Sequence, residues 1–302
     1  MQRGDIKRAL IRAAKDILRH NTLQVSAALS YYAVLSVFPA LIVLSAIVGF
    51  IPLPDLFNRV LMLMNRLLPA YTMNVVYSVL RDVLSSNKGT WLSFGMLGTL
   101  WVASTGFDAV IEALDVAYDV KDGRPFWKTR LLAIALAAIN GGLLAVGLAV
   151  MLVGPRFGDW LASEIGVSIA LATVWPVLRW VIAISFTVLA VEVLYFLGPN
   201  VKQRFGATLP GAVLSVAVWN LLSFLLGIYF RHFANFSKTY GTLGGVIAFM
   251  TWIYWTSFVL LAGAELNAEL AKESVQGRVE SKSASVDKEA LAPLETHIDD
   301  AA

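Results

Sequence analysis

The feature of this sequence that most constrains its fold is a set of six long apolar stretches. Together they contain only two of the chain's 24 basic and 21 acidic residues, Arg179 and Glu192. About 20 consecutive apolar residues in a helix span the core of a bilayer, and the lipid excludes charged side chains. We therefore predict an all-α, polytopic membrane protein with six transmembrane helices, over 27–51, 91–107, 131–153, 177–197, 207–230 and 241–264.

The composition excludes several other classes of protein. The chain is 58% hydrophobic and 15% charged, whereas about 25% of an ordinary soluble domain is charged. It has no cysteine, so disulfides and cysteine-bound metals are excluded, and its net charge of +3 is too small for a nucleic-acid binder. The three histidines stand alone, and no nucleotide-binding loop or nucleophile motif occurs. We expect no enzyme activity, no catalytic residue, no metal and no cofactor.

The regions outside the spans predict how the chain is organised. Residues 1–24 form a basic amphipathic helix, 25–272 a membrane domain and 273–302 a disordered tail, while two amphipathic patterns over 55–86 predict an extracytoplasmic helical hairpin. Sixteen basic residues lie on the side of the two termini and seven on the opposite side. Because cytoplasmic loops carry the excess of basic residues, both termini are expected in the cytoplasm.

Polar residues inside the spans mark a candidate substrate cavity. Glu192 lies within the fourth span, where an ionisable side chain is costly and is a functional candidate. It contacts either a proton or lipid headgroup, or one structural partner such as Asn140, Asn220, Arg130 or Lys202. We assign the cavity to Glu192 and to the other polar or helix-breaking residues predicted near it, which are Tyr31, Ser36, Pro39, Asn220 and Tyr240.

Two acidic helix faces follow the second and sixth spans. Their members recur at steps of three or four residues, which places them on one side of a helix. They form either a cation or proton site in the cytoplasm or a solvated face paired with nearby basic residues. The first face comprises Asp108, Glu112, Asp115 and Asp119, and the second comprises Glu265 and Glu269.

Three stretches of the sequence resemble the YihY/virulence-factor BrkB family of bacterial inner-membrane proteins. They are AALSYYAVLSVFP (27–39), RPFWKTRLLAIAL (124–136), and the pair YFLGPNVKQRFGATLPGAVLSVAVWN (195–220) and YGTLGGVIAFMTWIYWTSFVLLAGAELNAEL (240–270). The resemblance implies six helices, both ends in the cytoplasm and an inner-membrane location. The family was once labelled ribonuclease BN, a label that this sequence does not support, because it has no histidine cluster and no nucleic-acid surface.

These observations leave two functional hypotheses. The first is a transporter, or an export partner, for a lipid or lipid-linked envelope substrate, which would use Glu192 and the break at Pro39. The alternative is a non-transporting membrane scaffold that holds another envelope protein. Membrane lipids are expected partners in both cases, an envelope protein is a further candidate partner, and no nucleic acid is expected.

Overall fold

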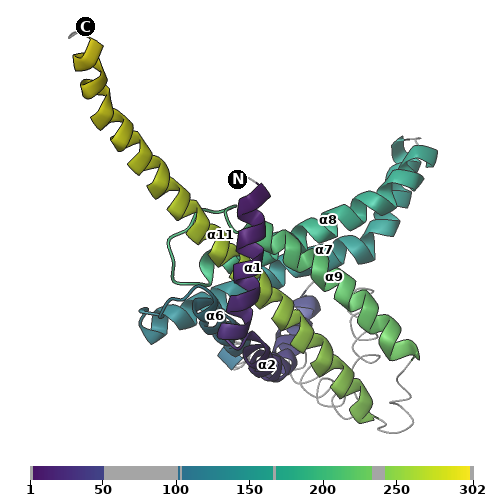
Figure 1. Cartoon of the computed structure of the whole chain (residues 1–302). Coiled ribbons are helices and arrows are strands. Elements are labelled where there is room, and N and C mark those ends of the chain that lie inside the picture. The colour runs from purple at the N-terminus through teal and green to yellow at the C-terminus, as the bar shows by residue number, and fades with distance from the viewer. Residues whose placement is uncertain (1–2, 51–100, 103, 166–167, 233–241, 300–302) are drawn as a thin grey trace.

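A computed structural model shows a chain built of α-helices (Figure 1). It describes residues 3–50, 101–102, 104–165, 168–232 and 242–299, and no strand occurs in these ranges. This confirms the all-α class for the part of the chain that is described. The helices are α1 (Arg3–Arg19), α2 (Thr22–Phe50), α6 (Thr105–Ala117), α7 (Phe126–Ile165), α8 (Ser168–Leu197), α9 (Leu209–His232) and α11 (Thr242–Asp299).

Four segments of the described residues are long and apolar enough to cross a membrane, with mean hydropathies of 1.7 to 2.2. They overlap the last four predicted spans and lie at Phe126–Met151, Val174–Leu197, Leu209–Phe230 and Gly245–Ser274. In lipid, a backbone must satisfy its own hydrogen bonds, which is why these apolar runs form helices. The predicted span 27–51 falls on α2, whose side chains beyond Ser36 lie outside the described residues. The hairpin 55–86 and most of the span 91–107 also lie outside them.

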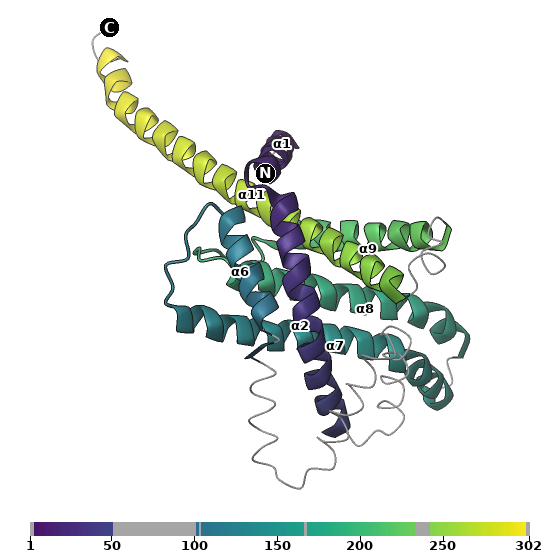
Figure 2. The ribbon, with the colours of Figure 1, turned by 90° about the horizontal axis from the view of Figure 1, so that it is seen from below.

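The long helices pack as two antiparallel pairs, α7 with α8 and α9 with α11 (Figures 1 and 2). Helix α2 crosses α11, and the short α6 lies against both α2 and α7. The largest buried apolar side chains come from four helices and meet where these helices converge; they are Ile111, Leu114, Leu136, Tyr195 and Leu261. Apolar side chains elsewhere on the long helices remain exposed, as expected for surfaces that face lipid.

Two glycines allow α9 and α11 to approach closely. A Cβ atom at Gly211 would lie 2.3 Å from the carbonyl oxygen of Gly263, and one at Gly263 would lie 1.9 Å from Ser215 Oγ. The Tyr195 hydroxyl contacts Ser215 Oγ at 2.8 Å and donates to the carbonyl of Leu260 beside this crossing. Small residues at helix contacts are typical of membrane proteins, where close backbone packing replaces the hydrophobic effect.

The Gly263→Ala substitution is expected to destabilise the protein. The added methyl group would overlap Ser215 and Tyr195, and overpacking of this kind costs roughly 1–3 kcal/mol. The thermal unfolding midpoint of the purified protein in detergent measures this loss. Gly245→Ala on the same helix is the matched control, because its Cβ would meet nothing within 4 Å. Equal midpoints for the two variants would contradict the close α9–α11 contact.

The end of α11 differs from the sequence prediction. We predicted a disordered tail over 273–302, whereas α11 continues as one helix to Asp299 and projects away from the other helices (Figure 1). Alanine, glutamate and lysine, which favour helix, are frequent in this stretch, and no proline breaks it before Pro293. Extending an already formed helix needs no new nucleation, so the helix propensity of these residues outweighs the low hydrophobicity that indicated disorder.

Candidate functional site

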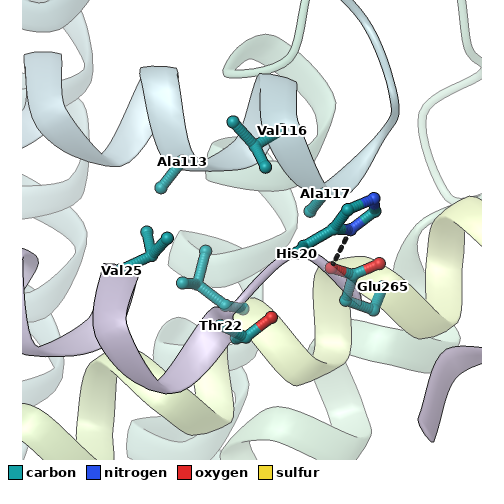
Figure 3. Close-up of a pocket in the computed structure, with 8 residues that line it drawn as sticks. His20, Thr22, Val25, Ala113, Val116, Ala117 and Glu265 are labelled. Carbon is teal, nitrogen blue, oxygen red and sulfur yellow. Dashed lines mark hydrogen bonds and ion pairs between the residues drawn. The ribbon is translucent and has the colours of Figure 1, made fainter. Parts of the chain in front are cut away.

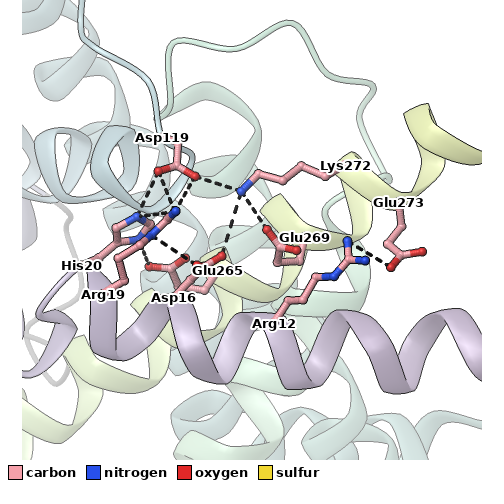
Figure 4. A network of polar contacts seen from close by, with 9 residues as sticks. All are labelled: Arg12, Asp16, Arg19, His20, Asp119, Glu265, Glu269, Lys272 and Glu273. Carbon is pink, nitrogen blue, oxygen red and sulfur yellow. Dashed lines mark hydrogen bonds and ion pairs between the residues drawn. The ribbon is translucent and has the colours of Figure 1, made fainter.

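A cluster of charged residues joins the ends of α1, α6 and the middle of α11 (Figure 4). At its centre the His20 ring lies between two carboxylates, with Nδ1 at 2.7 Å from Glu265 Oε1 and Nε2 at 3.0 Å from Asp119 Oδ1. The His20 ring therefore links Glu265 of α11 to Asp119, and its Nε2 also lies 2.9 Å from Arg19 Nη2. We call this set the ionic cluster; it comprises Asp16, Arg19, His20, Asp119, Glu265, Glu269 and Lys272.

Two left-handed residues bring the members of the ionic cluster together. Asn21 has a φ of 51° and turns the chain from α1 into α2, and Asp119 has a φ of 54° just after the end of α6. Asparagine and aspartate tolerate this conformation better than other residues with a side chain. At the end of α6, Val120 donates its N–H to the Asp115 carbonyl and closes the last turn. The positive φ of Asp119 thus carries its side chain toward α1 and α11.

Asp119 is the acceptor for cations from two other helices. Arg19 Nη2 lies 2.8 Å from both carboxylate oxygens, and Lys272 Nζ lies 2.9 Å from Oδ2. Burial by itself would raise the pKa of Asp119, but the hydrogen bonds from Lys272, His20 and Arg19, together with the charge of Lys272, outweigh it and lower that pKa to about 2. Asp119 is therefore ionised at neutral pH and joins Arg19, His20 and Lys272.

Packing and further ion pairs fix α1 along α11. Ala9 and Ala13 are buried against Leu266 and Leu270, and the small alanine side chains let the two helices approach. Beyond this contact Arg12 Nη1 lies 3.4 Å from Glu273 Oε1, and Lys272 Nζ lies 2.7 Å from Glu269 Oε1 within α11. The first helix is thus attached to α11 by both apolar and charged contacts.

A small cavity of ≈ 10 Å³ lies beside the His20–Glu265 contact (Figure 3). Apolar residues of α2, α6 and α11 form most of its wall, and the polar groups are His20, Thr22 and Glu265. Glu265 is 1% exposed, and its Oε2 has no hydrogen-bond partner among the described residues. A space of this size is about that of a single water molecule.

The first acidic face is divided among different partners. Asp115 is buried, accepts the N–H of Asn200 at 2.6 Å and lies 3.4 Å from Arg124 Nη2. Burial raises the pKa of Asp115 above the ordinary value of an aspartate. Arg124 also donates to the Gly198 carbonyl at 2.8 Å, which ties the loop after α6 to the loop after α8. Glu112 is exposed. In the described residues, no group of three or more histidine, aspartate or glutamate side chains could hold a metal ion.

Asp108, the first residue of that face, pairs with a buried arginine. Arg130 is 4% exposed and its Nη1 lies 3.1 Å from Asp108 Oδ2. The guanidinium carbon stacks 4.4 Å from the centre of the Trp101 ring, and Nη2 donates to the Trp101 carbonyl. A guanidinium held by a carboxylate, a carbonyl and an aromatic face is fixed in one orientation. This arrangement anchors the start of α7 to α6.

Glu192 is buried in α8, within the predicted fourth span, and its partner is a backbone group. It is 2% exposed, and Oε1 accepts the N–H of Gly206 at 2.8 Å. Gly206 has a φ of 86°, a conformation that glycine adopts readily. None of the predicted partners of Glu192 makes this contact. Its second oxygen, Oε2, has no hydrogen-bond partner among the described residues.

The other predicted cavity residues are dispersed. Ser36 donates to the Tyr32 carbonyl at 2.7 Å and contacts Thr105, and Asn220 donates to the Val216 carbonyl at 2.8 Å within α9. Tyr31 is 56% exposed and packs edge-on against Tyr32. The structure does not bring these three to Glu192. Pro39 lies in the part of α2 whose side chains are not described, and Tyr240 lies outside the described residues.

Sequence reasoning missed the residues that link the helices most directly. His20 is 245 positions from its partner Glu265, and nothing in the local sequence indicates that contact. Asn267 is 3% exposed, accepts the N–H of Gly211 at 2.9 Å and donates to the Thr208 carbonyl at 2.8 Å, so it caps the start of α9 from α11. The only sequence signal was that His20 and Glu265 were predicted on the same side of the membrane.

The helices and their buried polar contacts define a multi-pass helical membrane protein. The sequence profile of the virulence factor BrkB family matches residues 13–288, and the chain belongs to that family. The resemblance found in the sequence is thereby confirmed. No solved structure matches the chain.

Three bacterial relatives illustrate the match. The ribonuclease-like protein YfkH of Bacillus subtilis is 34% identical over 84% of this chain and 91% of its own length. A UPF0761 membrane protein of Paraburkholderia xenovorans is 25% identical over 88% of this chain, and the match spans 60% of that longer relative. Another, from Tolumonas auensis, is 26% identical over 84% of this chain and 82% of its own length. The word ribonuclease belongs to the name of the first relative.

Proposed function

We propose that this protein lies in the bacterial inner membrane with both ends in the cytoplasm and moves a lipid or lipid-linked envelope substrate, or assists its export. The observation that supports this most is the buried carboxyl group of Glu192, which has one oxygen without a partner in the described residues. A carboxyl group inside a membrane protein is costly, and such groups commonly mark substrate or proton pathways. Glu192 would contact a proton or the polar headgroup of the substrate.

The scaffold hypothesis remains the second candidate, because a different observation favours it. Ser36 and Asn220 satisfy their hydrogen bonds close to their own positions and do not face Glu192. A protein that only holds a partner needs packed helices and no path for a substrate. Under this hypothesis Glu192 would serve only to accept the Gly206 N–H and fix the loop that follows α8.

Transbilayer movement of a labelled lipid separates the two hypotheses. The purified protein is placed in vesicles of phosphatidylethanolamine and phosphatidylglycerol that contain a trace of fluorescent NBD-phosphatidylglycerol. Dithionite added outside bleaches only the outer leaflet, so continued bleaching reports movement from the inner leaflet. We expect faster bleaching with the wild-type protein than in protein-free vesicles. Equal rates would refute lipid movement, and a co-purifying envelope protein would then support the scaffold.

The Glu192→Gln variant tests the residue itself. Glutamine keeps an oxygen that accepts the Gly206 N–H but can no longer ionise. If Glu192 binds a proton or headgroup, the rate of lipid movement is expected to fall at least about tenfold, which corresponds to about 1.4 kcal/mol, at an unchanged unfolding midpoint. Lys121→Gln, which removes one exposed charge from a loop, is the control. A normal rate in Glu192→Gln would exclude Glu192 from the mechanism.

A further inference from the structure

Helix α1 has three faces of different chemistry. Ala9, Ala13, Asp16 and the adjoining His20 face α11 and the ionic cluster. Leu10, Ile11 and Leu18 lie on another side and are 48%, 51% and 73% exposed. Ile11 and Leu18 are seven residues apart and share one side of the helix, and Leu10 lies about 100° from Ile11 around the axis, so these three form one broad, mainly apolar face. We call it the outer apolar face.

Basic residues border the outer apolar face on one side. At 100° per residue, Arg8, Arg12, Lys15 and Arg19 follow next to Ile11 around the helix. Arg12 and Arg19 are paired with acids of the protein, yet their side chains remain 44% and 55% exposed, and Lys15 is exposed. A helix with exposed apolar residues beside a basic band is suited to the boundary between anionic headgroups and acyl chains.

The turn at Asn21 places α1 across the direction of α2. Figure 1 looks along α2 and shows α1 from the side, whereas Figure 2 shows α2 from the side and α1 foreshortened. Only His20 and Asn21 separate the two helices. If α2 crosses the bilayer, as its apolar sequence predicts, α1 lies at the membrane surface and along it.

We propose that α1 is a lipid-binding element whose outer apolar face and basic band bind the anionic surface of the membrane, while its inner face is attached to α11. The occupant of the outer apolar face is the lipid bilayer itself, because the basic band complements anionic headgroups and α1 is directly continuous with a membrane helix. This inference does not depend on whether a substrate is moved. It adds a lipid surface as a direct partner of the same helix that supplies His20 to the ionic cluster.

Site-directed spin labels on the full-length protein test this proposal. The chain has no cysteine, so Leu18→Cys and Lys15→Cys each give a single labelled site. Both positions are exposed, and neither side chain is part of the inner face. The labelled proteins are placed in nanodiscs of phosphatidylglycerol or of zwitterionic phosphatidylcholine. Oxygen, which partitions into lipid, and a water-soluble nickel chelate then report the depth of each label.

In phosphatidylglycerol we expect the Leu18→Cys label to collide mainly with oxygen. The Lys15→Cys label should lie less deep in the bilayer and be more accessible to the nickel chelate. In phosphatidylcholine the Leu18→Cys label should become several-fold more accessible to nickel, because the basic band has no anionic headgroup to bind. Dominant nickel accessibility in both lipids would overturn the proposal. An equal depth of the Leu18→Cys label in both lipids would refute the role of the basic band. Spin–spin broadening, together with protection of the label from oxygen and from nickel, would identify a second copy of the chain as the occupant instead.

Discussion

Replacing His20 with alanine is expected to lower the free energy of unfolding by about 3–5 kcal/mol. The substitution leaves Glu265, which is 1% exposed, without its hydrogen-bond partner and removes one of the groups that hold Asp119. An uncompensated buried acid costs more than the lost contact is worth. The measurement is reversible unfolding of the purified protein in mixed detergent micelles, followed by circular dichroism.

A double substitution provides the control for this prediction. Glu265→Leu in the His20→Ala background removes the buried acid as well as its partner, so most of the lost stability should return. The single variant Glu265→Leu supplies the last unfolding free energy that the double-mutant cycle needs. Additive losses in the double variant would show that the two side chains do not interact, and a loss below about 1 kcal/mol for His20→Ala would show that the contact is no stronger than an exposed ion pair.

Replacing Asn267 with alanine is expected to cost about 1–3 kcal/mol, because the buried Gly211 N–H loses its partner and the Thr208 carbonyl keeps only the N–H of Ala212. Asn267 is 3% exposed and joins the N–H of Gly211 and the carbonyl of Thr208 at the start of α9. Asn267→Asp keeps the acceptor for Gly211 but places a carboxylate oxygen against the Thr208 carbonyl, so it should not restore stability. The unfolding free energies of the two variants are compared with that of the wild type.

Asn220→Ala is the matched control for Asn267. Its amide donates to the Val216 carbonyl one turn earlier in the same helix, and the residue is exposed. Loss of this bond leaves the helix backbone intact, so a change of no more than about 0.5 kcal/mol is expected. Similar losses for Asn220→Ala and Asn267→Ala would contradict the role of Asn267 in holding α9 to α11.

The helices could be predicted from the sequence because their signals are local. A long apolar run without charge needs only its own residues to indicate a membrane helix, and the four candidate spans fall within a few residues of the prediction at most of their ends. The basic amphipathic helix predicted within residues 1–24 likewise matches α1. The tail after Ser274 is the exception, since helix propensity and low hydrophobicity indicate opposite states there and the structure continues the helix.

The candidate site was only partly predictable, because its contacts are not local. The burial of Glu192 follows from its place in an apolar run, but the Gly206 N–H that it binds is a backbone group and carries no residue signal. The spacing of Asp115 and Asp119 suggested one acidic face, yet the helix ends at Ala117. The positive φ of Asp119 then takes it to a different set of partners from those of Asp115.

The segment of α11 between Gly263 and Lys272 contacts different neighbours on two sides of one rigid helix. Gly263 and Asn267, four residues apart, lie against α9, while Glu265 and Glu269 lie toward the ionic cluster with α1 and α6. Because a helix turns by 100° for each residue, rotation of α11 about its axis by even one residue would separate both sets of contacts together. The packing between α9 and α11 and the attachment of α1 are therefore mechanically coupled, and any motion that releases one must strain the other.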